Sequence, residues 1–180
     1  MKKNKIFTGM LLMLGFISCY SQNERNPIGA IIGFAKDGYG AMVTYNYSLQ
    51  GRKSMIVSAL FTDATYSAEV DKIKYSDITL SLGYSFPLNL SKRRKLIADF
   101  DAGGVLGYEL YRNENYDLSR GKIVPDNSEV IYGAYVGLGI DYLISKRTYF
   151  FIKANGYYHA NSDLNTFVPF AGIGLKYYTN

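Results

Sequence analysis

Few residues in this chain could act in catalysis or bind a metal. His159 is the only histidine among the 180 residues, and Cys19 is the only cysteine. A metal site needs several clustered ligands, so a single imidazole is a weak basis for one. Ser162 follows His159 by three positions, and within a strand that spacing sends two side chains to opposite faces, which separates a nucleophile from its base. The sequence therefore predicts no catalytic residue, no metal site and no cofactor.

Glycine pairs are the other candidates for a chemical site, because glycine-rich loops can bind phosphate. The pairs are Gly103-Gly104, Gly137/Gly139 and Gly172/Gly174. A phosphate-binding loop opens a helix, and no helical periodicity follows any of these pairs. Glycines inside strands more often ease curvature or allow tight packing. We therefore expect them to shape a sheet.

The elements that position these residues are predicted to be strands. From Glu129 to Tyr177 the side chains alternate with period two, which is the period of a β-strand. One face of this stretch is apolar, uncharged and ends in tyrosines, whereas the other is small or polar and carries every charge. The predicted strands of this stretch are Glu129–Tyr142, Thr148–His159 and Phe167–Tyr178.

Five more strands precede this stretch. They are Ile28–Lys36, Tyr39–Leu49, Ser54–Ser67, Lys74–Phe86 and Leu96–Tyr111. Asp37-Gly38 predicts a hairpin in which the glycine takes positive φ. The strand from Ser54 alternates less well than the others, because Ile56 and Leu60 fall on its mostly polar face.

Eight strands with one apolar face can form a membrane barrel or a soluble barrel. The predicted strands exceed the roughly 5–6 residues usual in soluble sheets. The polar face is rich in glycine, and tyrosines end the apolar face as in an interfacial girdle. These features favour an all-β, eight-stranded, antiparallel, up-and-down outer-membrane β-barrel. A soluble barrel with its apolar face inside is the alternative.

Residues 1–21 have the pattern of a signal peptide. Lys2, Lys3 and Lys5 precede an apolar run too short to span a bilayer, and a cut before Gln22 suits the residues that precede it. Lipidation of Cys19 is the alternative form of processing. Removing 21 of 180 residues leaves 159 in a single barrel domain, residues 22–180, and removing three lysines lowers the net charge from +5 to +2. This balance does not support a nucleic-acid partner.

An even number of strands puts both chain ends on one side of the barrel, here called the termini side. The turns predicted there are short and basic, whereas the loops on the opposite, far side are longer and hold most acids, with the longest at residues 113–127. We expect the basic turns either to contact anionic headgroups or a periplasmic partner, or to be ordinary solvated turns. Their basic residues are Arg52, Lys53, Lys92, Arg93, Arg94, Lys95, Lys146 and Arg147.

Strand parity also predicts a set of charges in the lumen of the barrel. The set is Asp77, Asp99, Asp101, Glu109, Asp141, Lys153 and Lys176. Position along the strands puts both lysines in the layer that holds Asp99, Asp101 and Asp141. Carboxylates this close would repel without a cation between them. We therefore expect charge pairs that plug the lumen, the alternative being a wetter lumen in which each charge keeps its own water.

The second half of the chain resembles a known family. The residues that carry the resemblance are Gly107-Tyr108-Glu109-Leu110, Ile131-Tyr132-Gly133-Ala134, Tyr142-Leu143-Ile144-Ser145-Lys146-Arg147, and the closing stretch from Gly172 to Asn180. This succession is similar to TraO, the conjugal transfer protein of conjugative transposons in the Bacteroides group. The resemblance implies a non-enzymatic part of a mating apparatus that moves DNA between cells. Its implied partners are outer-membrane lipid and other transfer proteins, without direct contact to nucleic acid.

Two other functions stay open from the residues alone. A general small outer-membrane barrel, OmpA-like or OmpX-like, would act in surface binding or adhesion through its far-side loops. A barrel lipid hydrolase would use His159 with Ser162 and an acid.

Overall fold

The alternation of side chains produces strands throughout the described part of the chain. The computed structural model describes residues 26–49, 53–67, 72–90, 95–112, 129–162 and 166–179. The predicted signal peptide and the predicted loop of residues 113–127 lie outside these ranges. The strands are β1 (Pro27–Ala35), β2 (Gly38–Ser48), β3 (Ser54–Ser67), β4 (Lys72–Asn89), β5 (Leu96–Arg112), β6 (Glu129–Ser145), β7 (Thr148–His159) and β8 (Phe167–Tyr178).

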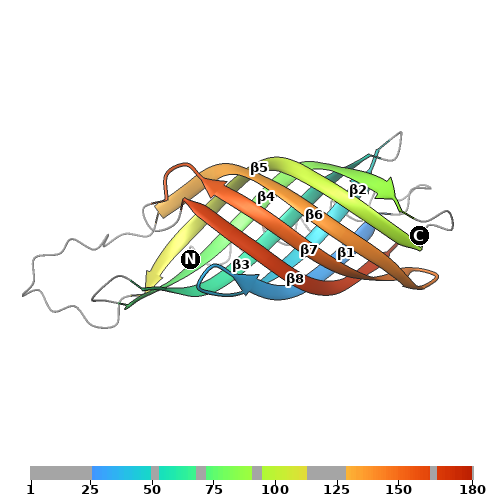
Figure 1. The fold of residues 1–180 in the computed structure, drawn as a ribbon. Helices are drawn as coiled ribbons and strands as arrows, with labels where there is room; N and C mark the ends of the chain where they lie inside the picture. Colours follow the sequence, from blue (N-terminus) through green and yellow to red (C-terminus); the bar gives the residue numbers. More distant parts are fainter. Residues whose placement is uncertain are drawn as a thin grey trace, which may run out of the picture.

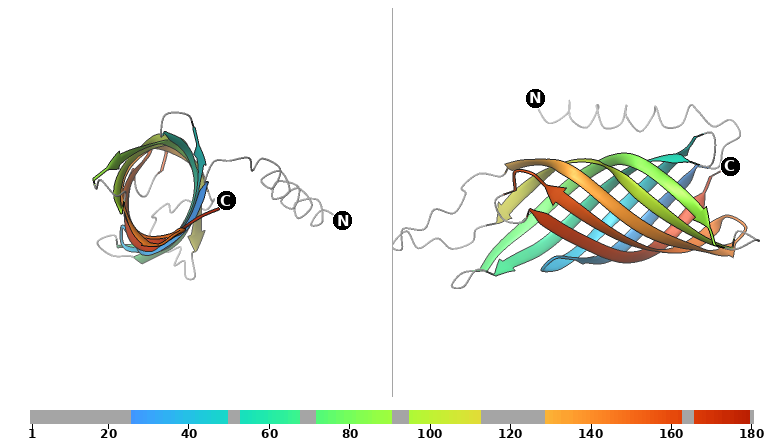
Figure 2. Two further views of the ribbon diagram at one scale, coloured as in Figure 1. Left: turned by 90° about the vertical axis from the view of Figure 1, so that its right-hand side faces the viewer. Right: turned by 45° about the horizontal axis from the view of Figure 1, so that its top comes forward.

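The strands pair in chain order, and β8 returns to β1 to close a barrel (Figure 1). All neighbours are antiparallel, and the closing register runs from Pro27 opposite Tyr178 to Ala35 opposite Phe170. An end-on view shows the resulting ring (Figure 2, left). The predicted fold class is therefore confirmed. In the described ranges, no helix is long and apolar enough to cross a membrane.

The predicted bounds of β3, β7 and β8 are confirmed, and the other strands differ by one to three residues at an end. The strands are not equally long: β1 has 9 residues, whereas β4 has 18 and β5 and β6 have 17 each. At the far-side ends of β3 and β4 the outer face turns polar. There Asp63 accepts hydrogen bonds from Tyr39 and from Ser76, both at 3.5 Å, and Lys74 is exposed.

The first hairpin differs from its prediction. The turn is made by Lys36 and Asp37, and positive φ (61°) occurs at Asp37, whereas Gly38 is already the first residue of β2. Aspartate tolerates the left-handed region better than most residues. Gly38 is needed for a different reason, because a Cβ there would collide with the carbonyl oxygen of Asp63 on β3.

Large apolar side chains face outward from all eight strands. Phe34 is 79% exposed and Ile32 71% exposed, and the strands on both sides of β1 carry similar residues. A soluble barrel would bury this face, since exposed apolar patches of such extent are rare on soluble monomers. The observed orientation is that of a barrel surrounded by lipid.

The lumen contains a core of its own. Buried apolar side chains from seven of the eight strands form one cluster: Ile31, Met42, Ile56, Leu60, Val105, Tyr135, Phe151, Tyr157, Val168 and Phe170. This explains the poorer alternation expected for β3, because Ile56 and Leu60 are 2% and 4% exposed and pack in this cluster. The prediction that the inward face from Glu129 to Tyr177 is small or polar is wrong, because that face also carries members of this cluster: Tyr135, Phe151, Tyr157, Val168 and Phe170.

We predict that the closing register is required for assembly. Deleting Tyr177–Asn180 removes the pairs of Tyr177 with Ile28 and Thr148 and of Tyr178 with Pro27. The truncated chain should lose the faster-migrating folded band that a closed barrel gives on an unheated detergent gel. Tyr177→Phe, which keeps the backbone pairing, is the control and should retain the band. A truncated chain that still shows the band would contradict the prediction.

Candidate functional site: the barrel lumen

All seven charged residues predicted for the lumen lie inside the barrel. None of these residues is more than 7% exposed, and Asp101 is fully buried. Burying a charge is unfavourable unless it is paired and hydrogen-bonded. The pairing of these residues therefore decides what the lumen can do.

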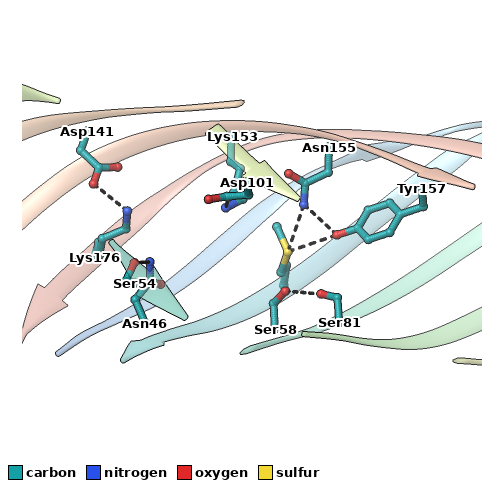
Figure 3. A network of polar contacts seen from close by, with 11 residues as sticks. Asn46, Ser54, Ser58, Ser81, Asp101, Asp141, Lys153, Asn155, Tyr157 and Lys176 are labelled. Atoms are coloured by element: carbon teal, nitrogen blue, oxygen red, sulfur yellow. Dashed lines mark hydrogen bonds and ion pairs between the residues drawn. The ribbon is translucent and has the colours of Figure 1, made fainter. Parts of the chain in front are cut away.

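Two ion pairs connect strands that are not neighbours. Lys153 of β7 pairs with Asp101 of β5, and Lys176 of β8 donates from Nζ to Asp141 Oδ2 of β6 at 2.6 Å. Nζ of Lys176 also lies 4.8 Å from the ring centroid of Phe151, on the strand between the two partners. Each pair thus joins two strands across a third. Figure 3 shows the side chains of both pairs.

Glycines on β6 make room for two polar side chains beside the first of these pairs, Asp99 and Asn155. Gly139 lies opposite Asp99 on one side and Lys153 on the other, and Gly137 lies opposite Asp101 and Asn155. A Cβ at Gly139 would collide with the Asp99 carboxylate, and one at Gly137 would collide with Asn155 Oδ1. The Gly137/Gly139 pair therefore serves lumen packing, because side chains from both neighbouring strands occupy the space over it.

The ion pairs differ in detail from the prediction, in which the two lysines lie in one layer with three carboxylates. Each lysine contacts one carboxylate, and Asp99 has no hydrogen bond or ion pair within the described part of the chain. Sequence position puts these residues at one level but cannot show which carboxylate each flexible lysine reaches.

A polar and aromatic layer follows the ion pairs toward the far side. Asn155 donates to the Tyr157 hydroxyl at 2.7 Å and lies 3.8 Å from the sulfur of Met42. The rings of Tyr157 and Tyr135 stack with centroids 5.8 Å apart. In Figure 3, Asn155 and Tyr157 follow Lys153 and Asp101 along the barrel. Sequence reasoning placed these residues on the inward face but missed the core they form, although their size was the available signal.

The far-side part of the lumen holds Asp77 and Glu109, which face each other across β4 and β5. Thr62 donates to Asp77 at 3.4 Å, and Ser162 donates to Glu109 at 3.1 Å. The alternation that would send His159 and Ser162 to opposite faces does not apply, because β7 ends at His159. The Ser162 hydroxyl reaches Glu109 in the lumen. His159 is buried, with its ring centroid 6.4 Å from that of Tyr157.

The basic residues of the termini side are exposed where the structure describes them, at Lys53, Lys95, Lys146 and Arg147. Nζ of Lys53 lies 5.6 Å from the ring centroid of Phe86. The remaining predicted residues of these turns, Arg52, Lys92, Arg93 and Arg94, lie outside the described ranges. Within those ranges, no group of three or more histidine, cysteine or acidic side chains is arranged to hold a metal ion.

Comparison with known sequences identifies the family. The family described as conjugative transposon protein TraO matches residues 30–179. This chain belongs to the TraO family. The resemblance inferred from the strand ends is confirmed and extends over nearly the whole TraO barrel, including β1 to β4. No curated protein sequence matches the chain.

Solved structures with the same fold as this TraO chain are small outer-membrane barrels. A major outer membrane protein from Thermus thermophilus has a TM-score of 0.65 at 12% identity, covering 88% of this chain and 100% of that one. Neisserial surface protein A has a TM-score of 0.60 at 8% identity, covering 86% and 96%. The N-terminal barrel of Pseudomonas aeruginosa OprF has a TM-score of 0.55 at 16% identity, covering 88% and 100%. At these identities the likeness concerns the fold alone.

We predict that Lys153→Met destabilises the barrel. The substitution leaves the fully buried Asp101 without its cation, and breaking a buried pair from one side typically costs about 3–5 kcal/mol. Thermal unfolding in detergent should show a clearly lower midpoint.

Two variants serve as controls for this prediction. Lys146→Met removes an exposed lysine and should leave the midpoint unchanged. The double variant Lys153→Met with Asp101→Leu replaces both charges by apolar groups and should recover most of the loss, because such replacements are often neutral. A Lys153→Met barrel as stable as the parent would contradict the pairing.

Proposed function

We propose that this TraO chain is a non-enzymatic component of a conjugative DNA-transfer apparatus, embedded in the outer membrane after removal of residues 1–21. The observation that carries the proposal is the family match over residues 30–179, on a barrel whose outward face is apolar around its whole circumference. That face suits lipid as its first partner.

The filled lumen favours an anchoring role over a conducting one. An eight-stranded barrel has an interior just wide enough for side chains. Here that interior contains two ion pairs and an apolar cluster. A barrel of this kind would not pass DNA itself. It would hold other transfer proteins at the membrane through its termini-side turns or its far-side loops, without binding nucleic acid directly.

The basic turns are the better candidate for contact inside the cell envelope. Exposed basic residues lie on the side of the barrel where β1 begins and β8 ends: Lys53, Lys95, Lys146 and Arg147. In the orientation usual for outer-membrane barrels, short turns face the periplasm. Anionic headgroups or an acidic surface of a periplasmic transfer protein would be attracted there.

We predict that a clean deletion of the gene lowers conjugation frequency strongly and leaves growth unchanged, as measured in matings between marked donor and recipient strains. Complementation with the parent gene should restore transfer. Complementation with Lys146→Glu/Arg147→Glu, which changes only exposed residues, should restore the barrel in the outer-membrane fraction but restore transfer less well.

Two outcomes would contradict this function. Unchanged transfer in the deletion strain would favour the alternative, a surface barrel acting in binding or adhesion. In the parent, a stable open conductance in planar bilayers would contradict the anchoring role.

A further inference from the structure

The lumen contains a cavity of about 350 Å³ that opens at the termini side. Its mouth is marked by the exposed residues Lys53 and Lys146. Its inner wall includes Asp99, Asp141 and Lys176. The volume lies in the range of roughly 300–1,000 Å³ that is usual for small-molecule sites.

Asp99 is the distinctive residue of this wall. It is 7% exposed, and its carboxylate packs over Gly139, where any Cβ would collide with it. In the described part of the chain it has no hydrogen bond and no ion pair, although the four other charged residues of this half of the lumen are paired. A buried carboxylate without a hydrogen bond is unfavourable, and Lys176, the main opposite charge that acts on Asp99, donates its hydrogen bond to Asp141.

The inner wall carries an excess of negative charge. Lys176 is its single cation among the described residues, and this cation is engaged by Asp141 through Oδ2. The other oxygen of Asp141, Oδ1, is buried and lacks a hydrogen-bond partner in the described ranges. Two carboxylates against one ammonium leave one negative charge facing the cavity, which a ligand cation could compensate.

The surroundings of Asp99 suit a compact cation. Hydroxyl groups of Ser54, Ser85 and Tyr178 line the same cavity and can accept hydrogen bonds from an ammonium or guanidinium group. The two lysines at the mouth would repel an extended polycation but would attract acidic groups beside a single cation. The wall and the mouth together favour a ligand with one cationic group directed inward and acidic groups outside.

We propose that this cavity is a binding site for an ammonium or guanidinium group, with Asp99 as its counter-ion. The same chemistry is offered by a lysine or arginine side chain of a periplasmic protein segment and by a free amine. The two lysines at the mouth distinguish these sources, because a protein segment can carry acidic groups that pair with them and a free diamine cannot. The site does not depend on a role in DNA transfer.

The test measures binding to the intact barrel in detergent by titration calorimetry. Three probes separate the sources: the blocked tripeptide Glu-Lys-Glu, the same tripeptide with norleucine in place of lysine, and putrescine. The lysine tripeptide should bind, the norleucine tripeptide should not, and putrescine should bind more weakly. Putrescine binding as tightly as the tripeptide would support the cation site and assign it to free amines.

Asp99→Asn is the decisive variant, and Asp77→Asn is its matched control. Both residues are buried lumen acids, but Asp77 does not line the cavity. Asp99→Asn should weaken tripeptide binding about tenfold or more, because a charge-assisted hydrogen bond is lost, whereas Asp77→Asn should leave it unchanged.

A second readout separates binding from structure. In the absence of probe, Asp99→Asn should unfold at the same temperature as the parent or higher, because it removes a buried charge that has no hydrogen bond or ion pair in the described part of the chain. Equal binding of the lysine and norleucine tripeptides, or a variant that binds like the parent, would overturn the proposal.

Discussion

The pairing of β1 with β8 is the constraint on which the rest of the structure depends. In hydrocarbon, unpaired backbone amides and carbonyls are so unfavourable that only helices and closed barrels can span a bilayer. Closure fixes a register around the whole ring, from Pro27 opposite Tyr178 onward. Once the register is fixed, alternation decides for every residue whether it contacts lipid or the lumen. The outward face and the charged interior are both consequences of this closure.

Alternation also explains how much of the fold and the site could be predicted from the sequence. The period of two places the buried Lys153 on the inward face and the exposed Leu138 of β6 on the outward face without any knowledge of their neighbours. A slip of one residue would reverse all faces of a strand. The period does not measure distances across the lumen. Lys153 pairs with Asp101 and not with Asp99 because of the distances between β7 and β5, which are separated by one strand. No local sequence pattern encodes those distances.

Side-chain volume is the second quantity that alternation leaves out. The period of two puts Met42 and Ile56 on the same face as the small polar residues of β2 and β3, and only the closed ring shows that the two side chains meet in one cluster. The glycines of β6 leave space for polar side chains of the neighbouring strands, with Asn155 over Gly137 and Asp99 over Gly139. The hairpin at Asp37 is a similar case, in which the special backbone conformation occurs one residue before the glycine.

The unequal strand lengths have a consequence for orientation about the membrane normal. At about 3.3 Å per residue, strands of 17 or 18 residues are roughly 20–30 Å longer than the 9 residues of β1. The outer face stops being apolar at the far-side ends of β3 and β4, where Asp63 accepts hydrogen bonds from Tyr39 and Ser76. The wall is therefore tall on one side of the barrel and low on the other. A neighbouring protein that binds the tall side fixes the rotation of the barrel about the membrane normal. Repeated copies of the barrel in an assembly would then all have the same rotation relative to that neighbour.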